Sequence, residues 1–283
     1  MAKIKYHEAG KKIYETGVYD GVLYPTNTDG SYGTGVGWQG LTSVQETPSG
    51  AESNPIYADN KKYLDIRSAE QFGATIQAYT FPKAFYECDG SAFMNLGNDN
   101  VIDFITIGQQ SRKVFGMAYK TVVGNDVQMN DYSYKIHIIY GATASPSQRE
   151  YQTVNESPEA IQFSWELTTT PIEIPNHKPS AIITLDVSQI LTISDPDEKA
   201  HWKGKVAELE GILWGTDPQY TLTSDVAVDE EKEYYKKEGN LYVIVAEPDV
   251  SEISTYYEKT GDAEPRLILP TEFPTIFVPY NAG

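Results

Sequence analysis

Alternation of apolar and polar residues is the most regular pattern along the chain. In residues 160–170 the apolar side chains occupy every second position, namely Ile161, Phe163, Trp165 and Leu167. Three further stretches repeat the pattern: residues 73–81, 134–142 and 179–187. A period of two residues is typical of antiparallel strands with one buried face. The body of the protein is therefore expected to be mainly β.

Residues 195–215 predict one long helix. Asp195 can be the N-cap before Pro196, and Glu198 stands where the acid of a capping box belongs. Apolar residues then recur at spacings of four, three and four and form one stripe: Trp202, Val206, Leu209 and Leu213. We expect an α+β, mainly β fold, with two packed antiparallel sheets and a flanking helix near residues 196–214.

Two stretches are expected to project from this body. Residues 44–63 are polar and contain two prolines, and they are too long for an ordinary hairpin turn, so they predict a long loop. Residues 223–264 hold 12 acidic and 4 basic residues, which is 8 of the 18 net negative charges. Here YYKKEG at 234–239 resembles YYEKTG at 256–261, and the first is typical of a hairpin turning at 238–240. We expect a core domain of residues 1–222, continued by 265–283, with an acidic surface β insert at 223–264.

The charge balance limits the classes of partner. The formal net charge is −18, from 40 acidic and 22 basic residues. This argues against nucleic-acid affinity, which depends on Lys and Arg releasing counterions from phosphates. It is compatible with a surface past which nucleic acid slides without adhering. No apolar run approaches the roughly 18 residues of a membrane span, so we expect synthesis in the cytoplasm and no membrane association.

Motifs that carry chemistry are weak in this sequence. GVGWQG at 35–40 matches a dinucleotide fingerprint, but no strand pattern precedes it and no helix pattern follows, so the match is interpreted as chance. GNDNVID at 97–103 could bind calcium weakly, although an Asn/Gly turn is the simpler interpretation. The histidines lack metal-ligand spacing, and the single cysteine, Cys88, is interpreted as a small buried hydrophobe. We expect no catalysis, no cofactor and no metal site.

Several separate blocks, in one order, resemble the major tail protein of long-tailed, non-contractile bacteriophages, which is the subunit of the tail tube. The blocks are YADNKKY at 57–63, TIQAYTFPKAFYECDG at 75–90, IGQQSRKVFGMAYKTVVGND at 107–126 and the long stretch 134–171. The resemblance covers roughly residues 16–220, with a weaker echo at 267–277. Residues 223–264 have no counterpart in it.

The resemblance implies a structural virion protein of the phage tail. Such subunits form hexameric rings that stack into a hollow tube lined by a continuous β-barrel. The implied partners are further copies of the chain, a tape-measure protein inside the tube, and tail-tip and terminator proteins. DNA would pass through the lumen into the host without specific binding, and acidic side chains lining the lumen would keep it from adhering.

The resemblance also nominates contact residues between subunits. Residues 44–63 are similar to the long loop by which family members reach an adjacent subunit or ring, with Glu46, Glu52, Tyr57 and Asp59 as candidates. Residues 107–126 predict a strand, a turn and a second strand. The polar residues of its turn would form hydrogen bonds and ion pairs within the subunit or with a neighbour, or would form a solvated edge: Gln109, Gln110, Arg112 and Lys113.

Two other classes of protein fit parts of the sequence. A carbohydrate-binding or receptor-binding β-sandwich would account for the 12% aromatic content and the tyrosine-rich insert, which suit stacking on sugars. The insert could also do this on the outside of a tube. An acidic glycoside hydrolase is the weaker alternative, since any chain with 40 acidic residues contains candidate carboxylate pairs. Polymerisation would separate a tube subunit from a lectin, which stays discrete.

Overall fold

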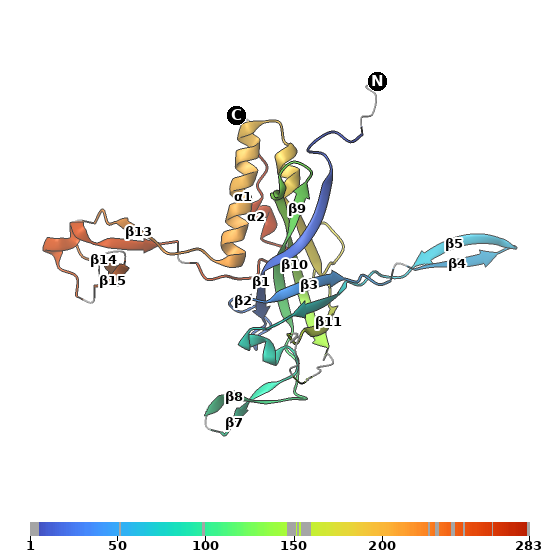
Figure 1. Cartoon of the computed structure of the whole chain (residues 1–283), viewed down its shortest axis with the longest axis horizontal. Coiled ribbons are helices and arrows are strands. Elements are labelled where there is room, and N and C mark those ends of the chain that lie inside the picture. Colours follow the sequence, from blue (N-terminus) through green and yellow to red (C-terminus); the bar gives the residue numbers. More distant parts are fainter. Residues whose placement is uncertain are drawn as a thin grey trace.

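The computed structural model describes residues 6–50, 52–97, 100–145, 151, 153, 160–225, 227–229, 232–238, 241–245, 247–261 and 263–281. The fold is mainly β, with antiparallel sheets and few helices, as the alternation predicts (Figure 1). The strands are β1 (Ile13–Pro25), β2 (Val36–Trp38), β3 (Leu41–Glu46), β4 (Ser53–Ala58), β5 (Lys61–Arg67), β6 (Gly73–Ala78), β7 (Ala92–Asn95), β8 (Val101–Ile107), β9 (Phe115–Asn125), β10 (Met129–Ser145), β11 (Phe163–Thr169), β12 (Ile182–Asp186), β13 (Gln219–Leu222), β14 (Tyr234–Glu238), β15 (Leu241–Ile244) and β16 (Tyr257–Thr260). The helices are α1 (Pro196–Trp214), α2 (Phe273–Ile276) and the 3₁₀ helices η1 (Lys83–Glu87), η2 (Val187–Thr192) and η3 (Val250–Thr255).

The core is one antiparallel sheet of eight strands. Seven strands follow the order β2-β1-β9-β10-β11-β6-β3, and β12 branches from β10. The branch lies where the long strand β10 changes partner, because Ile139 pairs with β12 whereas Ala142 pairs with β11. Gly141 lies at this point with φ +59°, a left-handed conformation that glycine adopts without strain. Glycine thus lets one strand serve both halves of the sheet.

The two halves of the sheet enclose the first hydrophobic cluster. Met117 of β9 and Ile76 of β6 are fully buried in it, together with Trp165 of β11. Phe85 of η1 closes the cluster, with its ring 5.0 Å from Trp165 and 5.6 Å from Phe115. The sequence predicts two packed sheets. In the structure, the two packed layers are the two halves of one hydrogen-bonded sheet that folds over on itself.

Helix α1 covers the opposite face of β1, β9, β10 and β12. Val206, Leu209 and Leu213 are buried there, in a second cluster that also contains Ile136 and Ile138 of β10. The predicted N-cap is confirmed. The Asp195 carboxylate accepts hydrogen bonds from the backbone N–H groups of residues 197 and 198, at 2.8 and 3.3 Å. The C-terminal stretch 267–277 packs into the same cluster through Leu267, Ile268 and Ile276.

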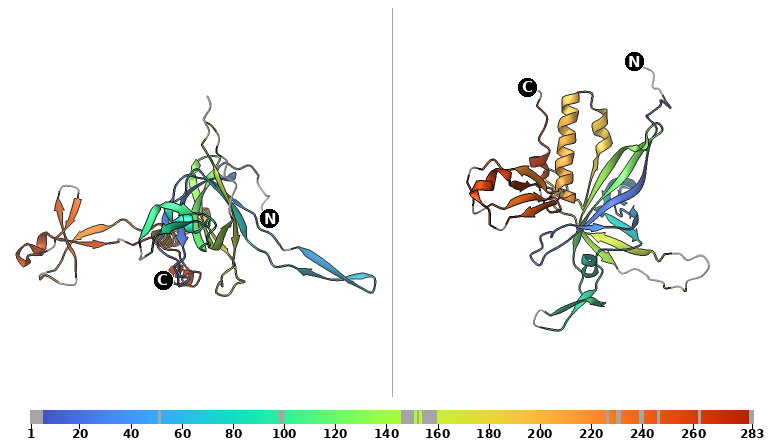
Figure 2. Two further views of the ribbon diagram at one scale, coloured as in Figure 1. Left: turned by 90° about the horizontal axis from the view of Figure 1, so that it is seen from below. Right: turned by 60° about the vertical axis from the view of Figure 1, so that its left-hand side comes forward.

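The prediction of a long loop at residues 44–63 is wrong. Residues 44–46 belong to β3, and β4 pairs with β5 in a hairpin that turns at Asp59 and Asn60. This arm extends far from the body (Figures 1 and 2). A polar composition fits a loop and also a hairpin exposed on both faces, so polarity did not distinguish the two.

Two other elements project from the body. The hairpin of β7 and β8 leaves it near η1, and a second sheet, in the order β13-β16-β14-β15, lies on the side opposite to the β4–β5 arm (Figure 1). The predicted hairpin strands at 234–244 are present, while residues 239 and 240 of its turn are outside the described residues. The second sheet begins at Gln219, four residues before the acidic stretch.

Candidate functional site

The β4–β5 arm presents a large exposed surface. Every residue of both strands is exposed. On one face the apolar side chains of Ile56, Leu64 and Ile66 line up, with Ile56 directly opposite Leu64 across the hairpin. An isolated two-stranded hairpin is at best marginally stable in water, and its outer edges are open to further strand pairing. The arm therefore exposes apolar side chains without packing against the body in the described part of the chain.

Three of the candidate contact residues lie on this arm. Glu52 is at its base, where its backbone pairs with Ser68. Tyr57 lies in β4 with 68% of its surface exposed. Asp59 forms the tip with a left-handed backbone, φ +52°. All three are positioned on the projecting element rather than in the body.

The β7–β8 hairpin is a second exposed surface, which sequence analysis did not identify as a projection. Phe104 is 84% exposed, and Val101, Ile105 and Ile107 are exposed in the same strand. Its mixed apolar sequence VIDFITI predicts a strand but gives no sign that both faces are open. Asp103, from the calcium candidate, forms an ion pair with Lys83, and residue 99 lies outside the described part of the chain.

The other four candidate residues lie in the loop between β8 and β9. Lys113 forms an ion pair with Glu87 at 2.6 Å, and the backbone N–H of Gln110 donates to the carbonyl of Gly90 at 2.8 Å. Gln109 and Arg112 are exposed in this loop, and Gln109 has φ +63°. The loop is thus held against the η1 region of the same chain, away from the β4–β5 arm.

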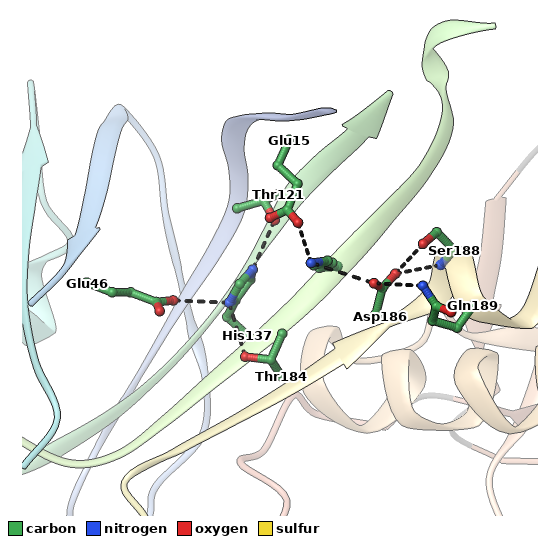
Figure 3. Close-up of polar contacts among 9 residues, drawn as sticks. Glu15, Glu46, Thr121, His137, Thr184, Asp186, Ser188 and Gln189 are labelled. Carbon is green, nitrogen blue, oxygen red and sulfur yellow. Dashed lines mark hydrogen bonds and ion pairs between the residues drawn. The ribbon is translucent and has the colours of Figure 1, made fainter. Parts of the chain in front are cut away.

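Glu46 belongs to a polar cluster instead of the arm (Figure 3). Its carboxylate accepts a hydrogen bond from the Tyr119 hydroxyl at 2.9 Å and lies 3.2 Å from Nδ1 of His137. The His137 ring is stacked on Tyr119, with ring centroids 4.7 Å apart, and its Nε2 lies 2.9 Å from the Thr121 hydroxyl. The hydrogen bond with His137 lowers the pKa of Glu46, with Tyr119 adding to it and partial burial opposing it.

A second polar group continues the same face of the sheet. Lys135 of β10 bridges Glu15 of β1 and Asp186 of β12. Asp186 also accepts a hydrogen bond from the backbone N–H of Ser188 at 3.0 Å, which caps η2 (Figure 3). The Glu15 hydrogen bond raises the pKa of Lys135. This face is opposite to the one that α1 covers, since His137 and Lys135 alternate with Ile136 and Ile138 along β10.

We call these residues the polar strip: Glu15, Glu46, Tyr119, Thr121, Lys135, His137, Thr184 and Asp186. The strip contains three carboxylates and one lysine, so its formal charge is −2 with His137 neutral. Each of these side chains takes part in a hydrogen bond, ion pair or ring contact within the chain. Of these residues, only Glu46 was a candidate from the sequence, because the strip is assembled from strands far apart in the chain.

Residues 35–40 and Cys88, which the sequence offers for cofactor binding or reactivity, have structural roles. Residues 35–40 form β2 and a turn at Gly40, and strand β3 follows where a dinucleotide fingerprint requires a helix. Cys88 is fully buried, and burial raises the pKa of its thiol to about 12, which disfavours the reactive thiolate. Across the described part of the chain, no group of three or more His, Cys, Asp and Glu side chains could hold a metal ion. Within the same residues, no helix is long and apolar enough to cross a membrane.

The fold and these surfaces define a mainly β protein with two exposed hairpins, a separate small sheet and a polar sheet face. No protein-family model matches the chain, and no curated protein matches it. Among solved structures, it is similar to a chain of the cryo-EM structure of the anti-feeding prophage baseplate, 6-fold symmetrised. The sequence identity is 8%, the TM-score is 0.27, and the match covers 65% of this chain and 98% of that chain. A TM-score this low supports no argument about fold or function.

Proposed function

We propose that this chain is the major tail tube subunit of a long-tailed, non-contractile bacteriophage, a structural virion protein without catalysis or cofactor. Its function is to assemble with further copies into stacked rings that form a conduit for DNA. The ordered resemblance of residues 16–220 to this family supports the proposal. The observation that carries it is the β4–β5 arm, which extends from the body with an apolar face exposed and, among the described strands, no partner at either outer edge.

The arm needs a partner to be stable in a fixed conformation. The hydrogen bonds of a two-stranded hairpin add little to its stability in water. Exposure of Ile56, Leu64 and Ile66 to water costs further free energy, because apolar surface is more stable when buried. Docking on a neighbouring copy would bury this face and pair an open edge. Such a contact joins two different surfaces of identical subunits and is therefore heterologous, which generates rings or filaments.

The core sheet offers a second route to assembly. Among the described strands, β12 pairs only with β10. At the other edge of β12, the backbone N–H and C=O of Ile182 are bonded to the Ser180 hydroxyl, and the rest of this edge is open to a neighbour's strand. Closing a ring of subunits through such edges removes the exposed edges of every copy. The sheet would then continue from one subunit to the next.

In such a ring, the polar strip is our candidate for the lumen face. It lies on the face of the sheet opposite α1, where Tyr119 and His137 are buried but the carboxylates of Glu15 and Glu46 are partly exposed. Its formal charge of −2 per subunit would be repeated in every copy. Negative potential along a channel would keep DNA phosphates from adhering. In a complete tail, the further partners would be tape-measure, tail-tip and terminator proteins, in a virion assembled in the bacterial cytoplasm.

Substitution of the apolar face of the arm tests the proposal. The double variant I56S/L64S should fold as the wild type does, because both side chains are exposed, but should not polymerise. Sedimentation and negative-stain images of concentrated protein measure this. The matched control is V127S/M129S, in the β9–β10 turn and at the first residue of β10, where the apolar side chains are more exposed than Ile56 and Leu64, and it should assemble normally. Normal assembly of I56S/L64S would reject the arm as the docking element.

A carbohydrate-binding role is the second candidate function. The four tyrosines grouped on one face of the second sheet favour it for that sheet. This observation concerns a different part of the molecule from the arm, and the two functions are compatible.

A further inference from the structure

The second sheet has two faces of different character. Successive residues of a strand point to opposite faces, so the strand pairing defines which side chains lie together. Tyr235 is paired with Tyr257 and with Ile244, Tyr257 with Leu222, and Lys259 with Tyr220. These residues share one face, which we call the tyrosine face: Tyr220, Leu222, Tyr235, Lys237, Tyr242, Ile244, Tyr257 and Lys259.

The other face is closed by the sheet's own core. Tyr234, Ile253 and Tyr256 are buried there, with Val228 and Val245 packed against them. The backbone N–H of Asp229 donates to the Tyr234 hydroxyl, and that of Asp249 donates to the Tyr256 hydroxyl, both at 3.1 Å. The buried side chains of this face form the hydrophobic core of the second sheet. The aromatic side chains of the tyrosine face lie outside this core, so they need another explanation.

Four rings form a continuous aromatic group on the tyrosine face. Tyr220 and Tyr242 are stacked with their centroids 4.0 Å apart and their planes 5° from parallel. Tyr235 lies 5.1 Å from Tyr220, and Tyr257 lies 5.0 Å from Tyr242. Tyr235 is buried beneath the group, whereas the other three rings are only partly buried. Leu222 and Ile244 beside them are 56% and 54% exposed. The face is therefore a partly exposed apolar surface. It belongs to the sheet that projects from the body (Figure 2).

Charge is segregated between the two faces. Residues 223–264 carry a net charge of −8, yet the described strand residues of the tyrosine face include two lysines and no carboxylate. Lys237 lies over the Tyr242 ring, with Nζ 5.5 Å from its centroid. Glu233, which precedes β14, accepts a hydrogen bond from the Tyr235 hydroxyl at the margin of the group. On the opposite face Lys236 pairs with Glu252, and Lys232 pairs with Asp225 and Glu258.

We propose that the tyrosine face binds an acidic polysaccharide. Tyrosine rings offer flat apolar surfaces against which the C–H faces of sugar rings pack, and Lys237 and Lys259 provide positive charge for carboxylates spaced along the glycan. A second copy of the same face is a poorer occupant, because it would bring four lysines together. Nucleic acid is also disfavoured, because binding its closely spaced phosphates takes more cationic side chains than the two lysines of this face. This inference goes beyond the assembly function and does not depend on it.

The test uses the full-length chain and immobilised polygalacturonate, alginate and hyaluronate, with methyl-esterified polygalacturonate as the uncharged counterpart. Binding measured by biolayer interferometry at low salt should be saturable for at least one of the three acids. Esterification should weaken binding to polygalacturonate, and added salt should weaken binding to all of them. Failure of all three acids to bind overturns the proposal, as does tighter binding of a single-stranded oligonucleotide.

Matched variants locate the binding on the tyrosine face. K237Q/K259Q should weaken binding roughly tenfold, which corresponds to about 1.4 kcal/mol. K232Q/K236Q removes the same charge from the opposite face and should have little effect. Y220A/Y242A should abolish binding, with circular dichroism used to confirm that it folds, and Y220F/Y242F should retain it. Equal losses in the two lysine variants would overturn the assignment. I56S/L64S should bind glycan normally, so failure of assembly and failure of glycan binding are distinguishable.

Discussion

At the scale of single residues, Glu46 links protonation to the stability of the fold. It is the last residue of β3, at the base of the arm, and its carboxylate contacts His137 and Tyr119 of the two central strands. Because its pKa is lowered in the folded state, Glu46 contributes stability above its ordinary pKa of 4.5, and that contribution is lost as the pH falls through the folded-state value.

The variant E46Q tests this linkage. At pH 7 we expect its free energy of unfolding to be lower than that of the wild type by about 1 kcal/mol, a modest value because the carboxylate is partly exposed and screened. The difference should disappear as the pH falls well below 4.5. Urea unfolding monitored by tryptophan fluorescence measures it, with E166Q on the exposed side of β11 as the control. A difference that does not change with pH would contradict this role of the charge.

The interactions of Glu46 could not be predicted from the sequence. Residues 44–63 indicated a polar segment, and Glu46 was interpreted as a contact to another subunit. Its observed partners are 73 and 91 positions away in the chain, and they meet Glu46 only because the sheet folds over. Cys88 was predictable, since burial is the usual state of a lone cysteine and requires no specific partner.

At the scale of elements, the sequence predicts those helices and strands whose capping residues or apolar pattern lie within one short stretch of the chain. Helix α1 was predicted at its observed limits because its cap, its apolar stripe and its final glycine all lie within about 20 residues. The strands around Ile76 and Trp165 were predicted because each buries one face. The strand around Ile138 was predicted from the same alternation, although its middle is buried on both faces. The β4–β5 arm was missed because an exposed hairpin buries neither face and shows no useful alternation.

The bend of β10 depends on one glycine. A Cβ atom on Gly141 would lie 2.4 Å from the backbone carbonyl oxygen of Thr170, and its φ of +59° disfavours any side chain. We expect G141A to lower the free energy of unfolding by about 2 kcal/mol or more. The control is G204A on the exposed side of α1, where nothing lies within 4 Å and where alanine should raise stability by about 0.5–1 kcal/mol. Thermal unfolding of both variants measures this, and a neutral G141A would show that the bend tolerates other residues.

At the scale of the whole molecule, the projecting elements carry surfaces that neighbouring copies would cover in the proposed assembly. The body has two well-packed clusters on either side of the sheet, so it does not need a partner for its own core. The arm, the β7–β8 hairpin and the edge of β12 leave apolar side chains and backbone groups at the surface. In the proposed assembly, these features mediate the contacts between copies, while the second sheet faces outward.

The central claim is that the chain assembles by itself into a hollow tube. Electron cryo-microscopy of the purified, concentrated protein tests this most directly. We predict tubes of stacked rings with an open channel, with the β4–β5 arm bridging neighbouring subunits and the polar strip facing the lumen. Particles that remain monomeric at every concentration, or filaments without a channel, would contradict the account.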